Sequence, residues 1–291
     1  MRSITLNIYL SAMSIFDLLL LVFSLLIFIP DNQCRELEHT YIFWAHGKRY
    51  QDTRTPVPIF CRFRFSTIQY LYPILLIAQT CSAWTCAAIT IDRFLHIKYP
   101  FQSKIWCTIR RTKIILISMT CIAVIYRIPT FFEYSYNERG GLLMSNMSLS
   151  LTYQIYYMTY TYTIFVILIP WSIMIILNFF VVKEVHKAHQ THLVMQGLQA
   201  HDEKENRRNL IVIYTALTFI AFNFLSTIAN IDEAFNMRLP RSLVPISNLL
   251  VCINSASNIL IYAFFGKRFR QMCMVYFCGR LRRKNDTQLT S

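Results

Sequence analysis

The chain has 291 residues, of which 55% are hydrophobic, and its formal net charge is +14. This composition is typical of a membrane protein with several spans rather than of a soluble domain. The positive charge does not indicate nucleic-acid binding, because the basic residues are distributed among the loops of such a protein. The loops contain no nucleophile–base pair and no metal-ligand spacing, so an enzyme is not expected.

Six largely apolar stretches predict six transmembrane helices, since a backbone that faces lipid must satisfy its own hydrogen bonds. In chain order they cover approximately residues 4–30, 65–92, 112–132, 156–184, 207–231 and 243–266. Residues 267–278 mix basic and apolar side chains, which predicts a short amphipathic helix on the inner leaflet, and a cytoplasmic tail follows over 279–291. Within the amphipathic helix, Cys273 and Cys278 are candidate palmitoylation sites. We therefore expect one all-α membrane domain over residues 1–291.

Basic residues are divided unequally between alternate loops. A set of four segments holds 18 of the 29 Lys and Arg residues, and the loops between them hold 10. The richer segments are 1–3, 94–113, 183–208 and 267–291. The positive-inside rule therefore predicts that both termini lie in the cytoplasm.

The outer side is predicted to carry two modifications. Cys34 and Cys61 fall in extracellular sequence, where oxidation is permitted, so they are a candidate disulfide; two unrelated free thiols are the alternative. Asn146 begins the sequence Asn-Met-Ser, which is a glycosylation acceptor.

Asp17 lies near the middle of the first apolar run, which is otherwise uncharged from Ile4 to Pro30. A carboxylate at that depth costs about 2.5–3.5 kcal/mol on insertion scales, so it usually has a polar partner or a function. The alternative is an aspartate that faces a polar gap between helices for packing alone. The polar residues of the other spans favour a function.

Three predicted helices carry polar residues three or four positions apart, which places them on one helix face. In the second span these residues are Gln79, Ser82, Cys86, Thr90 and Arg93. In the fifth span Asn223, Ser226 and Asn230 follow Phe219, and in the last span Ser247, Asn254, Asn258 and Tyr262 share a face with Ser255 beside them. Interhelical hydrogen bonding alone would explain most of these residues. Asp17, Ser82, Asn254, Ser255 and Asn258 together, however, supply the oxygen ligands that a small hard cation accepts.

The pair Asp92–Arg93 closes the second span at its cytoplasmic end. Arg93 has a local acidic partner in Asp92 and a more distant one in Glu205, before the fifth span. Simple anchoring of the helix end at the lipid surface is the usual explanation of such a pair. Because this pair ends a polar face, we interpret it as a switch.

These residues occur in segments that resemble rhodopsin-like G-protein-coupled receptors, and specifically the FMRFamide-type neuropeptide receptors of invertebrates. The resembling segments are MRSITLNIYLSAMSIFDLL, YPILLIAQTCSAWTCAAITIDRF, RIPTFFE, ILIPWSIMIILN and NSASNILIYAFFGKRFR, in this order. The resemblance implies a seven-helix receptor bundle. Met1 falls where the first intracellular loop of the family lies, so the first family helix is expected to be missing, which leaves six spans.

The resemblance also implies roles for single residues. Asp17, Ser82, Asn254, Ser255 and Asn258 resemble the sodium pocket of the family, so no cofactor is expected beyond an allosteric sodium ion. Arg93 resembles the arginine that couples to the G protein, restrained by Asp92 and Glu205. The segment from Asn258 to Tyr262 resembles the NPxxY switch with Ile259 in place of proline, and Phe219 and Asn223 lie at the lever of the sixth family helix.

The predicted function is a plasma-membrane receptor that binds an extracellular peptide, namely a short amidated FMRFamide-like peptide, and signals through a heterotrimeric G protein. The residues expected to line the ligand vestibule are Tyr70, Tyr72, Glu133, Tyr157, Tyr160, Asp232 and Glu233. Acids would pair with an arginine of the peptide, and aromatic rings would stack on it. The alternatives are a truncated form that does not signal, a six-span channel or transporter, and a small-molecule chemosensory receptor.

Overall fold

The computed structural model describes residues 2–28, 59–136, 142–194, 212–228 and 243–265. Its long elements are α1 (Arg2–Phe28), α3 (Ile59–Lys98), α5 (Ile109–Arg127), α7 (Ile169–Val194), the helix Val212–Ile228 and α9 (Leu243–Phe265). A 3₁₀-helix, η2 (Ile128–Phe132), extends α5, and two π-helical segments, η3 (Tyr153–Thr161) and η4 (Thr163–Leu168), precede α7. The short elements are α4 (Ser103–Trp106), β1 (Tyr134–Tyr136), β2 (Leu142–Met144) and α6 (Asn146–Leu149).

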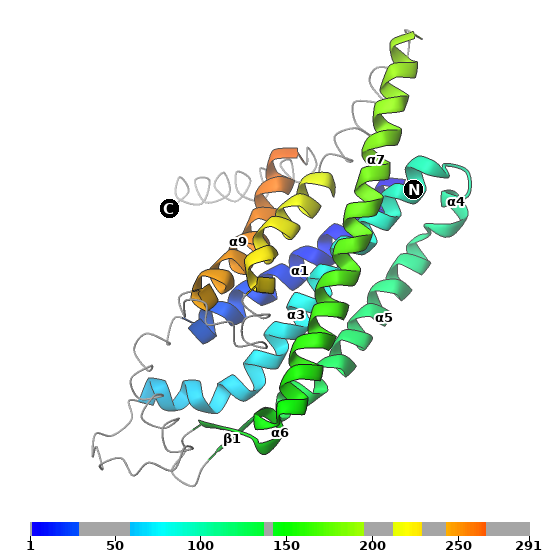
Figure 1. Ribbon diagram of the computed structural model, residues 1–291. Coiled ribbons are helices and arrows are strands. Elements are labelled where there is room, and N and C mark those ends of the chain that lie inside the picture. The colour runs from blue at the N-terminus through cyan, green and yellow to red at the C-terminus, as the bar shows by residue number, and fades with distance from the viewer. Residues whose placement is uncertain (1, 29–58, 137–141, 195–211, 229–242, 266–291) are drawn as a thin grey trace, which may run out of the picture.

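The long helices form a bundle in which α3 is central. It contacts α1, α5 and α7, and α1 in turn contacts α9, so that α1 lies between α3 and α9 (Figure 1). The start of α1 and the short α4 lie at one end of the bundle, whereas β1 and α6 lie at the other. Residues from α1, α3 and α9 can therefore meet inside the bundle.

A helix lies within each of the six predicted ranges, although the bounds differ. Four stretches of the described residues are long and apolar enough to cross a membrane, and Val212–Ile228 is a shorter apolar helix. These four are Ile4–Ile27, Thr67–Lys98, Ile109–Phe132 and Tyr153–Glu184. The helix that carries the second predicted span continues beyond residue 92, since α3 ends at Lys98. Asp92 and Arg93 thus lie inside a helix rather than at its end.

The fourth predicted span is not a regular α-helix over its first half, which precedes α7. Thr159 Oγ1 and Thr161 Oγ1 donate to carbonyls five residues earlier, at 3.0 and 2.7 Å, within the wide turns of η3. Pro170 follows at the second position of α7, where it has no N–H to give and its ring crowds the preceding turn. The α-helical ladder therefore begins again at α7.

The expectation of an all-helical chain also missed a small hairpin. β1 pairs with β2 in an antiparallel register in which Ser135 lies opposite Leu143. Strands of three residues are too short to show an alternating pattern in the sequence. The hairpin lies in the connection between η2 and η3, and the architecture remains a helical bundle.

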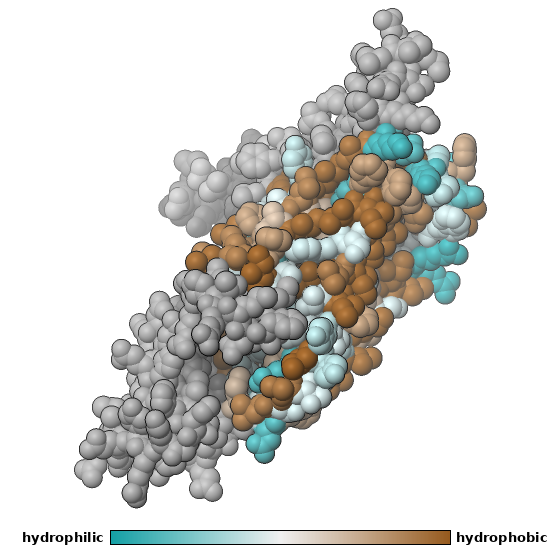
Figure 2. Space-filling model, viewed as in Figure 1, coloured by the Kyte–Doolittle hydropathy of each residue, from teal (hydrophilic) through white to brown (hydrophobic). Residues whose placement is uncertain are grey.

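The surface of the bundle is apolar along the length of its helices. Figure 2 shows a broad hydrophobic face over α5 and α7, with hydrophilic residues gathered toward the end where α4 lies. Ile117, Ile122 and Phe179 are among the large apolar side chains that are more than half exposed. A continuous face of this kind is the surface that a protein presents to lipid.

The interior combines apolar clusters with polar helix faces. Met13, Ile89, Met174 and Phe219 form a buried cluster that joins α1, α3, α7 and the helix Val212–Ile228. The predicted polar faces turn inward as well, since Ser82, Thr90, Asn223, Ser226, Ser247 and Asn254 are all buried. Polar groups inside such a bundle require partners, and these partners define the candidate site.

Candidate functional site

Asp17 is the centre of a hydrogen-bonded cluster that joins three helices. Its side chain on α1 is 0% exposed. Its Oδ1 accepts a hydrogen bond from Ser82 Oγ on α3 at 2.7 Å, and its Oδ2 accepts one from Asn258 Nδ2 on α9 at 2.8 Å. The predicted neighbours Asn254 and Ser255 are buried on the same stretch of α9. The structure therefore brings together residues that lie as many as 241 positions apart in the chain.

The oxygens of this cluster fit a small hard cation. Asn254 Oδ1 and Asn258 Oδ1 are buried acceptors that have no hydrogen-bond partner. Such acceptors are costly inside a protein unless a donor, a water molecule or a cation satisfies them. Together with the Asp17 carboxylate they provide one formal negative charge and two amide oxygens, which is the donor chemistry that alkali and alkaline-earth ions prefer.

The Asp92–Arg93 pair lies on α3, toward the end of the bundle where α4 is found. Arg93 Nη2 donates to Asp92 Oδ2 at 2.6 Å, and the side chains are only 2% and 5% exposed. His96 Nδ1 is 3.4 Å from the same carboxylate oxygen, so Asp92 has a second neighbour. Glu205, the other predicted partner of Arg93, lies outside the described residues, as does the side chain of Tyr262.

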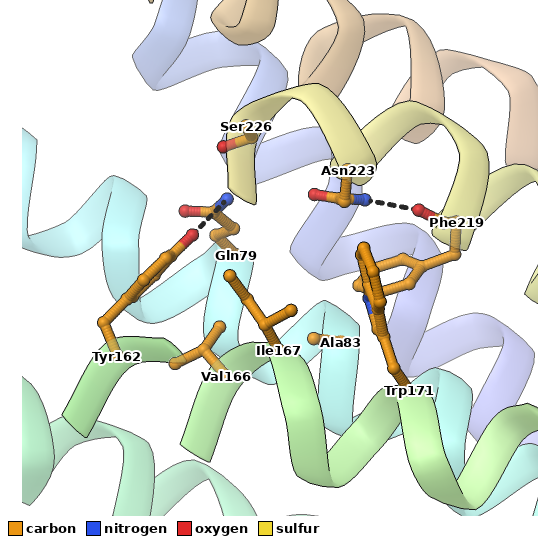
Figure 3. Close-up of a pocket in the computed structure, with 9 residues that line it drawn as sticks. All are labelled: Gln79, Ala83, Tyr162, Val166, Ile167, Trp171, Phe219, Asn223 and Ser226. Atoms are coloured by element: carbon orange, nitrogen blue, oxygen red, sulfur yellow. Dashed lines mark hydrogen bonds between the residues drawn. The ribbon is translucent and has the colours of Figure 1, made fainter. Parts of the chain in front are cut away.

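Phe219 and Asn223 face α3 and α7 from the helix Val212–Ile228. Both are buried, and the Asn223 amide donates to the Phe219 carbonyl at 2.9 Å. In Figure 3 they border a cavity together with Gln79, Tyr162 and Trp171, and Gln79 Nε2 donates to the Tyr162 hydroxyl at 3.4 Å. The cavity is narrow, with about 10 Å³ of free volume, which is room for roughly one water molecule.

The lining of this cavity includes an unpaired donor. The indole Nε1 of Trp171 is buried and has no hydrogen-bond partner. Since buried donors are rarely left unpaired, the cavity is a place where a ligand group or a water molecule would be stabilised. The cavity also lies between three helices, so a change in its contents would bear on their packing.

The predicted vestibule residues are divided between buried and exposed positions. Glu133 follows η2 and is buried rather than open to solvent, and its Oε1 accepts from the Tyr153 hydroxyl at 2.9 Å. Tyr157 donates to the carbonyl of Tyr126 at 2.6 Å, so its hydroxyl is already paired. Tyr72 packs edge-to-face on Tyr134, with ring centroids 6.1 Å apart.

The other predicted outer residues are exposed or not described. Tyr70 is 58% exposed and Tyr160 is 44% exposed. Asn146 is exposed at the start of α6. Cys34, Asp232 and Glu233 lie outside the described part of the chain, and the side chain of Cys61 is not described. Cys273 and Cys278 of the predicted amphipathic helix also lie outside it.

Comparison with known proteins decides the family. The profile of the family described as 7 transmembrane receptor (rhodopsin family) matches residues 1–262. The chain belongs to the rhodopsin family of seven-transmembrane receptors. This is a family of receptors rather than of enzymes, and it does not favour a channel or a transporter.

Two relatives confirm the resemblance to FMRFamide-type receptors. The chain is 31% identical over 219 residues to an FMRFamide receptor of Drosophila melanogaster, an alignment that covers 72% of this chain and 39% of that protein. It is 28% identical over 285 residues to the FMRFamide peptide receptor frpr-18 of Caenorhabditis elegans, which covers 93% of this chain and 61% of that protein. The chain thus spans about two fifths to three fifths of the length of these relatives.

Within this rhodopsin-family chain, Arg127 is a buried charge that the sequence analysis did not single out. It ends α5 and is 4% exposed. Its guanidinium lies over the rings of Tyr126 and Tyr162, at 4.7 and 5.3 Å from their centroids, and it donates to Thr80 Oγ1 at 3.4 Å. Because Tyr162 lines the cavity, Arg127 packs directly behind one of its lining residues. Its position in an apolar stretch of the sequence is the signal that could have identified it, because charged residues within such stretches are rare and usually functional.

Glu133 is expected to make the stability of the protein depend on pH. Burial raises its pKa from 4.5 to about 7, against the smaller lowering effects of the Tyr153 hydrogen bond and the Arg127 charge. The folded state then binds the proton more tightly than the unfolded state, so stability falls as pH rises from about 4.5 to 7, by on the order of 3 kcal/mol.

Thermal unfolding of the purified receptor at several pH values tests this effect. The wild-type chain should unfold at a lower temperature at pH 7 than at pH 5, and Glu133→Gln should reduce that difference. Glu184→Gln, at the far part of α7, is the matched control and should behave like the wild type. An equal pH dependence in Glu133→Gln and the wild type would contradict the assignment.

Proposed function

We propose that this chain is a plasma-membrane receptor that is activated by an extracellular peptide and that signals through a heterotrimeric G protein. The observation that supports it most is the joining of α1, α3 and α9 at Asp17, with the buried Asp92–Arg93 pair on the same α3. Asp17 and Arg93 are the two charges at membrane depth to which the family resemblance gives a signalling role. The peptide class is inferred from the two FMRFamide receptors to which the chain is similar.

The orientation that we propose puts both termini in the cytoplasm. The excess of Lys and Arg in alternate loops supports it. In this orientation the end of the bundle with α4 and Arg93 faces the cytoplasm, and the end with β1, α6 and Glu133 faces outward. A ligand would then approach from the side of the cavity that Gln79 and Tyr162 line.

The mechanism is a population shift between two packings of the bundle. A peptide that binds the outer vestibule more tightly in the active packing favours outward movement of the helix Val212–Ile228. Phe219 and Asn223 link that helix to α3 and α7 across the cavity, so a change there would alter their packing. At the cytoplasmic end, Arg93 would leave Asp92 and become available to the G protein. Coupling free energies of about 1–3 kcal/mol between sites are typical and suffice to bias such an equilibrium.

An allosteric sodium ion would be held by Asp17, Asn254, Ser255 and Asn258, with Ser82 orienting the carboxylate through its hydrogen bond. The ion would supply a positive charge beside a buried carboxylate, which stabilises the packing that keeps these groups together. Asp17 would thereby join three helices more tightly in the inactive packing than in the active one. The expectation that no other cofactor is needed stays part of this proposal.

The ligand that we propose is a short amidated peptide that carries an arginine and an aromatic residue. Asp232 and Glu233 would supply negative charge near the outer end of the helix Val212–Ile228. The exposed rings of Tyr70 and Tyr160 are available for stacking or cation–π contacts. Glu133 is less suited to direct contact, because it is buried against Tyr153.

A screen of amidated peptides tests the proposal. The chain is expressed in cells without endogenous peptide receptors, and dissociation of the G-protein subunits is measured by energy transfer after each peptide is added. We expect a response to peptides that end in an arginine, an aromatic residue and an amide, and no response to the same peptides with a free carboxylate. A response to small polar or volatile compounds with none to peptides would favour a chemosensory receptor instead.

A further inference from the structure

Three metal-ligating side chains meet at the end of the bundle where α4 lies. Asp92 and His96 are one turn apart on α3, and Cys107 directly follows α4. One ligand atom from each residue lies within 4.8 Å of the other two. Asp92 and His96 are buried, and Cys107 is half-buried. In tetrahedral zinc sites, bond lengths of about 2.0–2.3 Å place neighbouring ligand atoms closer together than 4.8 Å. The three side chains would therefore have to move slightly toward one another to bind a zinc ion.

The histidine is already held in the manner of a metal ligand. His96 Nδ1 lies 2.7 Å from the backbone carbonyl oxygen of Asp92. An N–H on Nδ1 that donates to this carbonyl fixes the tautomer in which Nε2 carries the lone pair. Metal-binding histidines usually donate their other ring N–H to a carbonyl or a carboxylate in this way. A metal ion bound through Nε2 would leave this backbone contact of Nδ1 in place.

We propose that Asp92, His96 and Cys107 form a binding site for a divalent transition-metal ion of the zinc class. The ligand set of one carboxylate, one imidazole and one thiolate suits Zn²⁺ and does not suit Mg²⁺ or Ca²⁺, which prefer oxygen. Three protein ligands leave the fourth tetrahedral position for water. When the metal binds, the S–H bond of Cys107 breaks, a metal–sulfur bond forms, and the proton passes to solvent.

Occupation of this site would act on the switch residue. Arg93 Nη2 is 2.6 Å from Asp92 Oδ2, so a divalent ion bound to the same carboxylate would repel the guanidinium. The metal and Arg93 therefore compete for Asp92. By linkage, any condition that detaches Arg93 from Asp92 tightens metal binding, and metal binding favours the detached arginine. This competition goes beyond the peptide-driven mechanism and needs no extracellular ligand.

Cobalt is the probe, because a thiolate ligand and tetrahedral geometry give Co²⁺ characteristic absorption bands. Purified wild-type chain in detergent should develop these bands, and added Zn²⁺ should remove them. Cys107→Ala should abolish the thiolate band, and His96→Gln should weaken the affinity at least about tenfold. Cys121→Ala removes an exposed thiol on α5 that lies outside the cluster, and it should leave the bands unchanged.

Two further measurements make the outcome decisive. Zn²⁺ should raise the thermal unfolding temperature of the wild type and of Cys121→Ala but not that of Cys107→Ala, which should unfold like the metal-free wild type. Arg93→Ala should bind the metal several times more tightly, because a competing cation is gone. A wild-type chain without bands, or bands that persist in Cys107→Ala, would overturn the site, and weaker binding by Arg93→Ala would overturn the competition. None of these readouts uses a peptide or a G protein, so they are distinct from the tests of the proposed function.

Discussion

Arg93→Ala is expected to abolish G-protein activation while leaving the amount of receptor at the cell surface largely unchanged. The proposed role of Arg93 is to leave Asp92 and contact the G protein, and alanine has no group that could make that contact. Folding should tolerate the change, because Asp92 keeps His96 Nδ1 as a neighbour at 3.4 Å. The measurement is agonist-stimulated nucleotide exchange on the G protein, together with surface labelling of the receptor.

Arg110→Ala is the matched control for this variant. Arg110 is an exposed cation on the first turn of α5, and α4 connects it with α3. Its removal changes the charge of the same end of the bundle without touching Asp92, so activation should stay close to that of the wild type. Normal signalling by Arg93→Ala would defeat the switch assignment, whereas an equal loss in both variants would show only that positive charge at this surface matters.

The polar faces were predictable from sequence because they depend on helical spacing. Gln79, Ser82, Cys86, Thr90 and Arg93 recur at intervals of three or four, which places them on one face of a helix. It was also predictable that this polar face points into the bundle, since amide and hydroxyl groups avoid lipid. The grouping of Ser82 and Asn258 with Asp17 was inferred from the polar helix faces and from the family resemblance, and the structure supplies the distances.

The ends of helices and the paths of the connections between them were not predictable from the sequence. Charged residues were taken as the end of the second span, yet α3 continues to Lys98 because a helix that projects from lipid needs no apolar side chains. The proximity of Cys107 to Asp92 depends on the path of the connection through α4, which no periodicity records. The burial of Glu133 likewise depends on Tyr153, which is 20 residues away.

Asp17→Asn is expected to remove the effect of sodium on agonist binding. The amide keeps the size of the side chain, and with its Nδ2 and Oδ1 it can still hydrogen-bond to Ser82 or Asn258, so the helices should remain together. It lacks the negative charge that attracts the ion. Since Asn254 Oδ1 and Asn258 Oδ1 are neutral, they would not hold sodium without the carboxylate. Ser14→Ala is the control, because Ser14 lies on the same helix and its hydroxyl donates to the Leu10 carbonyl of that helix at 2.9 Å.

The affinity of the purified receptor for an activating amidated peptide, measured in sodium chloride and in potassium chloride of equal ionic strength, tests the central claim most directly. The account predicts that sodium weakens peptide binding to the wild type and to Ser14→Ala by roughly 5- to 150-fold, the range of typical allosteric coupling. It predicts no difference between the two salts for Asp17→Asn. A sodium effect of the same size in Asp17→Asn and the wild type would contradict the claim that this carboxylate, bound between α1, α3 and α9, controls the equilibrium of the bundle.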